Sequence, residues 1–258
     1  MTRDVRDAAM LFQAMACCDE RDPRTMRTPP PDYLAQLDDG VADLRFGWSP
    51  DLGRVIPEEP AIVELCHEAA QVFAKHAASY SEDPIRLEDP HDELEQDTEY
   101  SKVQQAQFFR SFMDYQDPLS WAAKLPPERY AQLTIYIRDR SDRPNALDYA
   151  QSITPAVRYK PKTRLADLFG RIDLLLCPVI ARTAFVCGTG GVTPWQYTAY
   201  THIVNVSGYC AASVPAGFHE GMPVGLQIIG RPGDEHLVLR AARAFERERP
   251  WTHLRPAV

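Results

Sequence analysis

The sequence reads Ala211-Ala-Ser-Val-Pro215 and, a few residues later, Val224-Gly-Leu-Gln-Ile-Ile229. Both are short apolar runs bounded by turn residues, which predicts two β-strands. The segment His219-Glu-Gly-Met222 lies between them and suits a hairpin turn. The two runs therefore predict a hairpin near the carboxyl end of the chain.

A buried strand and a helix are expected on either side of this hairpin. Asp173-Leu-Leu-Leu-Cys-Pro178 is a continuous apolar run, typical of a strand buried on both faces. After Gly233-Asp234, three apolar residues recur at helical spacing, namely Leu237, Ala241 and Phe245. Residues 171–258 are therefore predicted to be the strand-rich part of an α/β fold.

The distribution of glycine separates this part from the rest. Of the 13 glycines, three lie in the first 169 residues and ten in the last 89. Since glycine supplies tight turns and close backbone approaches, residues 1–170 are predicted to be mostly helical. A helix is expected to start at Asp4, which can cap it. Its expected apolar face consists of Val5, Ala8, Phe12 and Met15.

Two further elements are predicted before residue 80. Leu44-Arg-Phe-Gly-Trp48 reads as a short strand. Pro57-Glu-Glu-Pro60 is expected to open a helix that runs to about Ala78. Glu58 and Glu59 suit the positive end of that helix dipole.

Composition excludes several classes of protein. The chain has 258 residues, with 28 Lys and Arg against 36 Asp and Glu, a net charge of −8. This charge argues against a nucleic-acid partner, which requires a clustered basic face. The sequence holds no apolar run long enough for a transmembrane helix and no signal-peptide region after Met1, so a cytoplasmic protein is expected.

The six cysteines are scattered without a Cys-x-x-Cys, and the seven histidines lack metal-ligand spacing. Reduced thiols are therefore expected, with no metal site and no cofactor.

A resemblance to a known family rests on three segments. They are Asn205-Val-Ser-Gly-Tyr-Cys-Ala-Ala-Ser-Val-Pro-Ala-Gly217, then Gly221-Met-Pro-Val-Gly-Leu-Gln-Ile-Ile-Gly230, and the buried run Asp173–Pro178. Together they resemble the C-terminal portion of the amidase signature family. Met1-Thr-Arg-Asp-Val-Arg-Asp-Ala-Ala resembles the segment that follows the catalytic core of that family, so the resemblance covers nearly the whole chain.

The resemblance implies an α/β fold with a mixed β-sheet flanked by helices, an α/β/α sandwich. It also implies that the N-terminal half of this fold is absent. Residues 1–258 are accordingly interpreted as a single truncated amidase domain.

Members of the family hydrolyse amides with a Ser, a cis-Ser and a Lys, whose segments lie upstream of the one that Met1 begins. The sequence holds no Gly-Ser-Ser-Gly-Gly and no Gly-Gly-Ser. No catalytic residue is therefore assigned, and the chain alone is expected to be inactive. Cys187, followed by Gly188-Thr-Gly-Gly191, is the most attractive substitute nucleophile, but a structural loop is the preferred interpretation.

Three hypotheses follow. The first is the C-terminal part of an amidase that acts on a small amide substrate. The second is a non-catalytic amidase-like binding protein or subunit, and the third is an active hydrolase with an unrecognised site. Because unpaired strand edges would remain, the chain alone is expected to be marginally stable or to aggregate. A second copy or another partner that covers its open sheet is the expected partner.

The resemblance also suggests which residues could face a substrate. Trp195, Tyr197 and Tyr200 precede the Asn205 segment and are candidates for lining the substrate pocket, with core packing as an equal alternative. Relatives that amidate transfer RNA tend to carry an acid where this chain has Thr198, which argues against that reaction here.

Overall fold

The structure is a computed structural model that describes residues 1–21, 28–53, 55, 57–82, 164–186 and 194–254. These residues all belong to one compact unit. The elements along the chain are α1 (Val5–Met15), β1 (Arg45–Trp48), α2 (Pro60–His76), β2 (Ser79–Ser81), β3 (Leu174–Pro178), α8 (Pro194–Ser207), β4 (Cys210–His219), β5 (Met222–Gly230) and α9 (Glu235–Glu248). The strands expected near residues 44–48 and 173–178 are therefore confirmed.

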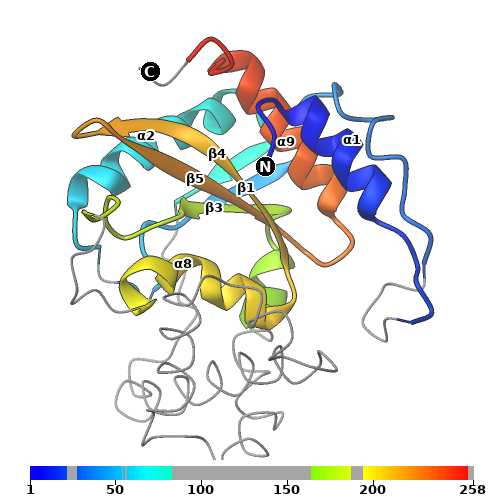
Figure 1. The fold of residues 1–258 in the computed structure, drawn as a ribbon, viewed down its shortest axis with the longest axis horizontal. Helices are drawn as coiled ribbons and strands as arrows, with labels where there is room; N and C mark the ends of the chain where they lie inside the picture. Colours follow the sequence, from blue (N-terminus) through cyan, green and yellow to red (C-terminus); the bar gives the residue numbers. More distant parts are fainter. Residues whose placement is uncertain (22–27, 54, 56, 83–163, 187–193, 255–258) are drawn as a thin grey trace, which may run out of the picture. The chain divides into compact units, whose positions relative to one another are not determined.

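Five strands form one mixed sheet in the order β2-β1-β3-β5-β4 (Figure 1). β1 runs parallel to both β2 and β3. β5 runs antiparallel to β3 on one side and to β4 on the other. Every residue of β3 is buried, as its continuous apolar sequence predicts.

The predicted hairpin is confirmed, with longer strands than the sequence suggested. His219 of β4 pairs with Met222 of β5, so that Glu220 and Gly221 form the turn. Both turn residues have positive φ, 49° and 78°. This backbone matches the two-residue turn whose twist suits antiparallel strands.

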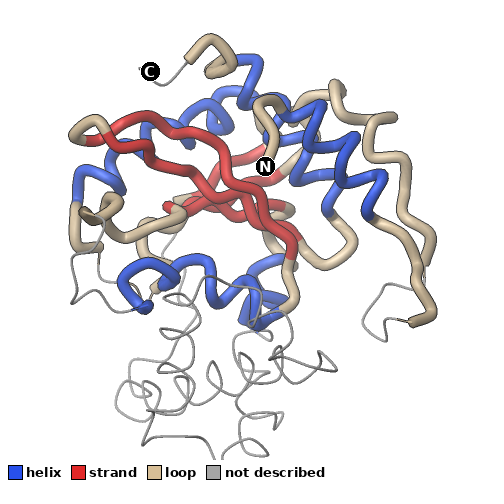
Figure 2. The backbone as a smooth tube through the Cα atoms, in the orientation of Figure 1, coloured by secondary structure: helices blue, strands red, loops and turns tan. Residues whose placement is uncertain are grey.

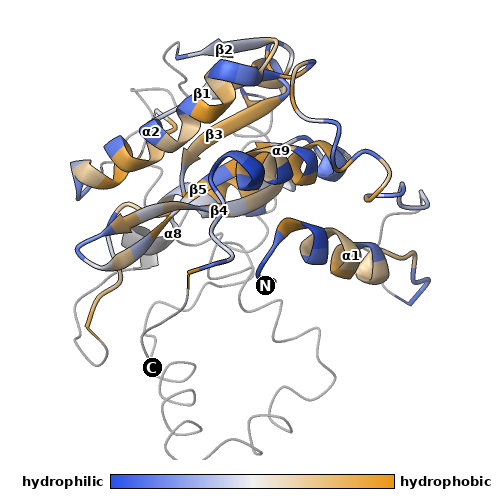
Figure 3. Ribbon diagram, turned by 90° about the horizontal axis from the view of Figure 1, so that it is seen from above, coloured by the Kyte–Doolittle hydropathy of each residue, from blue (hydrophilic) through white to orange (hydrophobic). Residues whose placement is uncertain are grey.

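Helices cover both faces of the sheet, which gives the expected α/β/α sandwich (Figure 2). The core on one face joins α1, α2 and α9 to the sheet. Phe73 of α2 stacks on Phe46 of β1 at 4.5 Å and on Phe245 of α9 at 5.9 Å. The core on the other face includes residues of a helical stretch at 164–169 and of α8, among them Phe169 and Ile203. Figure 3 shows that α9 contains both polar and apolar residues, and the apolar Val238, Ala241 and Phe245 are buried, as an amphipathic helix requires.

The first helix starts as predicted, and Val5, Ala8 and Phe12 of its expected apolar face pack in or against the core, whereas Met15 does not. The backbone N–H of Asp7 donates to Asp4 Oδ1 over 2.7 Å, which caps α1. Val5 and Ala9 are buried, whereas Met15 is 61% exposed. Met15 lies in the last turn and lines a pocket there rather than packing into the core.

The second helix begins later than Pro57, and the two glutamates stand before its first turn rather than within it. α2 starts at Pro60, and no acidic residue lies in its first turn. Glu59 is the N-cap residue but makes no capping bond with its side chain. The two carboxylates instead bind the segment that follows β3. Glu58 accepts from the Arg182 guanidinium, and Glu59 accepts from the Thr183 backbone N–H.

Candidate functional site

A network of hydrogen bonds holds the segment that leaves β3. The backbone N–H groups of Glu58 and Glu59 both donate to the carbonyl of Ala181, each over 3.2 Å. The Glu59 carboxylate accepts from the Thr183 backbone N–H at 3.2 Å and from Thr183 Oγ1 at 3.1 Å. Arg182 adds an ion pair to Glu58 at 3.2 Å. The segment is thus fixed to the residues before α2, 124 positions earlier in the chain.

The tip of the β4–β5 hairpin lies near the Glu59 carboxylate. His219 Nε2 is 3.8 Å from Glu59 Oε2. Next to it, Phe218 exposes 56% of its surface, and Met222 is also exposed. Glu59 therefore joins three parts of the fold, namely the start of α2, the segment after β3 and the tip of the β4–β5 hairpin.

Of the three residues expected to line a substrate pocket, Tyr200 is completely buried. Its hydroxyl donates to the Pro50 carbonyl over 2.6 Å. Burial raises the pKa of this phenol well above its usual range, with smaller contributions from Cys177 and Asp51. Tyr200 is therefore a neutral hydrogen-bond donor within the core formed with Leu52 and Cys177.

Trp195 and Tyr197 belong to the same helix, α8, at its amino-terminal end. The structure describes the backbone of these two residues but not their side chains. Their expected role in lining a pocket stays a prediction, as does that of Tyr200.

Three thiols in the described part of the chain are unsuited to nucleophilic attack. Burial raises the pKa of Cys66, Cys177 and Cys210 to about 12 in each case. A thiol is reactive only as the thiolate, which is scarce near neutral pH at such values. Cys187 and the glycine-rich stretch 188–191 lie outside the described residues.

Within the described ranges, no three His, Cys, Asp or Glu side chains are grouped so that they could hold a metal ion. Nor is any helix in those ranges both long and apolar enough to cross a membrane.

The sequence profile of the amidase family matches residues 1–239. The chain belongs to the amidase signature family. Among solved structures, a bacterial aryl acylamidase of the amidase signature enzymes superposes with a TM-score of 0.74 at 26% identity, covering 99% of this chain and 55% of its own. A glutamyl-tRNA(Gln) amidotransferase subunit from Thermotoga maritima gives a TM-score of 0.66 at 26% identity, covering 96% of this chain and 52% of its own.

Curated relatives agree with this assignment to the amidase signature family. A glutamyl-tRNA(Gln) amidotransferase subunit of Lacticaseibacillus casei is 29% identical over 95% of this chain and 53% of its own length. Its counterpart from Geobacter sp. strain M21 is 30% identical over 100% of this chain and 56% of its own. The chain therefore spans about half the length of the curated relatives it matches.

Two clusters of side chains went unrecognised in the sequence. One is the Glu59 network, since a carboxylate before a helix is equally well explained by the dipole. The other is a pocket lined by Phe12, Tyr33 and Glu235, which come from three distant segments. Two signals were available in the sequence. Glu59 stands directly before Pro60, and Tyr33 comes shortly after three prolines, but neither pattern indicates which side chain will be the partner.

Proposed function

We propose that this chain forms the C-terminal part of an amide hydrolase of the amidase signature family. In this proposal the catalytic Ser, cis-Ser and Lys come from polypeptide outside the 258 residues, and the chain by itself is inactive. The match to the family over residues 1–239 carries the proposal. The length of the relatives supports it, because they extend well beyond the region they share with this chain.

The proposed contribution of this chain to the enzyme is one wall of the substrate pocket. Trp195 and Tyr197 would present an aromatic surface from α8 to a small amide with an apolar body, and Tyr200, buried in the core, would hold α8 in place. Two observations support this role for α8. The segment that precedes it is anchored through Glu59, and Tyr200 is tied to Pro50. A fixed wall lowers the entropic cost of placing the amide against the nucleophile.

The proposed surface for the remaining polypeptide is the outer strand β4. β4 is ten residues long and lies at the edge of the described sheet. Ala211 and Ser213 are exposed on it, and Pro215, which lacks a backbone N–H, limits pairing to the part of the strand before it. A long, exposed edge strand with small uncharged residues favours pairing with another strand. We therefore expect polypeptide that carries the catalytic groups, or a second copy of the chain in its absence, to cover β4.

The decisive experiment compares two proteins. One is the 258-residue chain, and the other is the product obtained when the in-frame coding sequence before Met1 is included. With an aryl amide as substrate, the longer product should release amine, and the 258-residue chain should show no turnover above the uncatalysed rate. Equal turnover by the short chain would overturn the proposal and favour an unrecognised active site.

A different result would favour the second hypothesis, a non-catalytic amidase-like subunit. The curated relatives are themselves named as subunits of an amidotransferase. If the longer product folds and is inactive alone but co-purifies with a partner chain, the amide hydrolase proposal fails and the subunit interpretation replaces it.

A further inference from the structure

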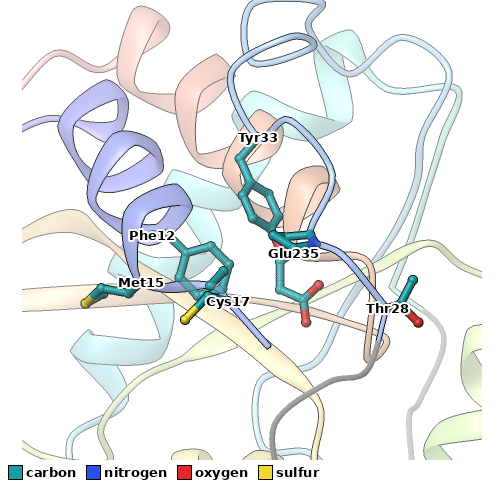
Figure 4. A pocket seen from close by; sticks show the side chains of 8 residues that line it. Phe12, Met15, Cys17, Thr28, Tyr33 and Glu235 are labelled. Carbon is teal, nitrogen blue, oxygen red and sulfur yellow. The ribbon is translucent and has the colours of Figure 1, made fainter. Parts of the chain in front are cut away.

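A pocket of about 240 Å³ lies beside the first turn of α9, and none of its lining residues belongs to the Glu59 network. It is bordered by the last turn of α1, the segment 28–33 and the first turn of α9 (Figure 4). Phe12, Met15 and Tyr33 are among the apolar side chains that line it. The carboxylate of Glu235 and the thiol of Cys17 also line it.

The aromatic wall of this pocket is held in place by contacts within the protein. Phe12 and Tyr33 meet edge to face, with their ring centroids 4.9 Å apart. Tyr33 is buried, and its backbone N–H donates to Gln13 Oε1 over 2.8 Å. Folding therefore already fixes these side chains, and binding a ligand costs little further side-chain entropy.

Glu235 differs in its partners from two other acids of the chain. The neighbouring Asp234 forms an ion pair with Arg231 at 3.1 Å, and Asp38 binds Arg243 at 3.0 Å. Among the described residues, Glu235 has no Lys, Arg or His within ion-pair distance, and its Oε1 accepts only the Gly233 backbone N–H at 3.2 Å.

The pocket thus combines a carboxylate without a cationic partner in the described part of the chain and two aromatic rings. In Figure 4 the Glu235 carboxylate lies beneath Tyr33, between the Phe12 side chain and Thr28. Burial raises the pKa of Tyr33, and the negative charge of Glu235 raises it further. The faces of aromatic rings and a carboxylate both attract a cation, whereas they repel an anion.

We propose that this pocket binds a small organic ammonium ion that carries one aromatic ring or a short alkyl chain. The ammonium group donates to Glu235, and the apolar part packs against Phe12, Tyr33 and Met15. A volume of 240 Å³ is smaller than that of a pocket for a drug-sized ligand, and it suits a molecule of one ring. The inference is independent of amide hydrolysis, since none of these residues belongs to the proposed substrate wall.

The first test measures binding of benzylamine, benzyl alcohol and benzoate to the 258-residue chain by isothermal titration calorimetry near neutral pH. Benzylamine should bind most tightly and benzoate should not bind. Glu235→Gln should weaken benzylamine about tenfold or more, to the level of benzyl alcohol, because a charge-assisted hydrogen bond is lost. The matched control is Glu248→Gln, at the opposite end of α9, which should leave binding unchanged.

The second test does not depend on a variant that folds. Cys17 lines the pocket, and its neighbour Cys18 is exposed but does not line it. Benzylamine should slow alkylation of Cys17 by iodoacetamide in proportion to occupancy and leave Cys18 unaffected, as peptide mass spectrometry would show. Equal binding of benzylamine and benzoate, or equal alkylation of Cys17 with and without benzylamine, would overturn the proposal. Neither result would bear on the amide hydrolase, which is tested by turnover.

Discussion

Arg45 and Asp173 join the starts of two neighbouring parallel strands through four hydrogen bonds. The Arg45 guanidinium donates twice to the carboxylate, over 3.1 and 2.8 Å. The Arg45 backbone N–H donates to Asp173 Oδ2 over 2.9 Å, and the Asp173 backbone N–H donates to the Arg45 carbonyl over 2.8 Å. The two residues are 128 positions apart, so this pair fixes the register between β1 and β3.

We expect Asp173→Asn to lower the free energy of unfolding by about 1 kcal/mol near neutral pH, because the partly exposed pair contributes less than a buried one. The Arg45 hydrogen bonds lower the pKa of Asp173 in the folded protein. Its contribution is therefore present above the unfolded pKa of Asp and is lost as the pH falls through the lower folded pKa.

Urea unfolding of the wild type and of Asp173→Asn at neutral and strongly acidic pH would measure the contribution of Asp173 to the free energy of unfolding. The difference between the two proteins should shrink in acid. Asp19→Asn is the control, since the Asp19 carboxylate also accepts from an arginine, Arg21, but one that lies only two residues away in the chain. A difference that persists at both pH values would show that Asp173 acts through packing rather than charge.

Glu59→Gln should loosen the segment that follows β3. The amide retains one acceptor oxygen but loses the charge that Thr183 and His219 approach. Limited trypsin digestion should cut after Arg182 faster than in the wild type, because a freed backbone enters a protease more readily. Glu64→Gln, on the exposed side of α2, should digest like the wild type. Unchanged cleavage after Arg182 in Glu59→Gln would mean that the backbone bonds to Ala181 suffice.

Phe73→Ala should destabilise the unit by about 3–5 kcal/mol, because Phe73 is fully buried between two other aromatic rings. A loss of this size could unfold the chain, so Phe73→Leu, with a smaller loss, extends the measurement. Phe218→Ala is the control and should cost about 0.5 kcal/mol or less, since Phe218 is exposed at the hairpin. Thermal unfolding followed by circular dichroism checks all three variants.

Tyr200→Phe should cost about 1 kcal/mol, because it removes one hydroxyl and leaves the Pro50 carbonyl without that donor. The ring would still fill the same space in the core. If Tyr200 also lines the substrate pocket of the longer enzyme, the variant should raise KM at nearly constant kcat. A change in stability with KM unaffected would assign Tyr200 to packing alone.

Ala211→Lys should reduce self-association of the 258-residue chain. A charged side chain on an exposed edge strand opposes pairing with a second strand. Sedimentation velocity should show a smaller associated fraction for Ala211→Lys than for the wild type. Ala35→Lys introduces the same charge at an exposed position away from the sheet and should have no effect. Equal association of all three proteins would remove β4 as the contact surface.

The elements that the sequence alone determined are those whose cause is local. The hairpin follows from the Glu220-Gly221 turn between two apolar runs, and α1 follows from the Asp4 cap. The buried strand β3 follows from five consecutive apolar residues. Each depends on backbone preferences and hydrophobic pattern within a few positions, which a sequence displays directly.

Membership in the amidase signature family could likewise be inferred from the sequence, on the segments that form β3, β4 and β5. The expected roles of Trp195, Tyr197 and Tyr200 could not be derived as surely. Aromatic residues on one helix are equally compatible with a pocket and a core, and only tertiary packing distinguishes them.

The tertiary structure alone decided the contacts that join distant segments. Glu59 binds Thr183 rather than serving its own helix, Arg45 binds Asp173, and Glu235 lies beside the ring of Tyr33. A side chain takes the partner that folding brings within about 3 Å, and many acids and donors in the sequence are chemically equivalent until then. Sequence patterns therefore predict which segments form elements, whereas the partners of charged and aromatic side chains are set by how those elements pack.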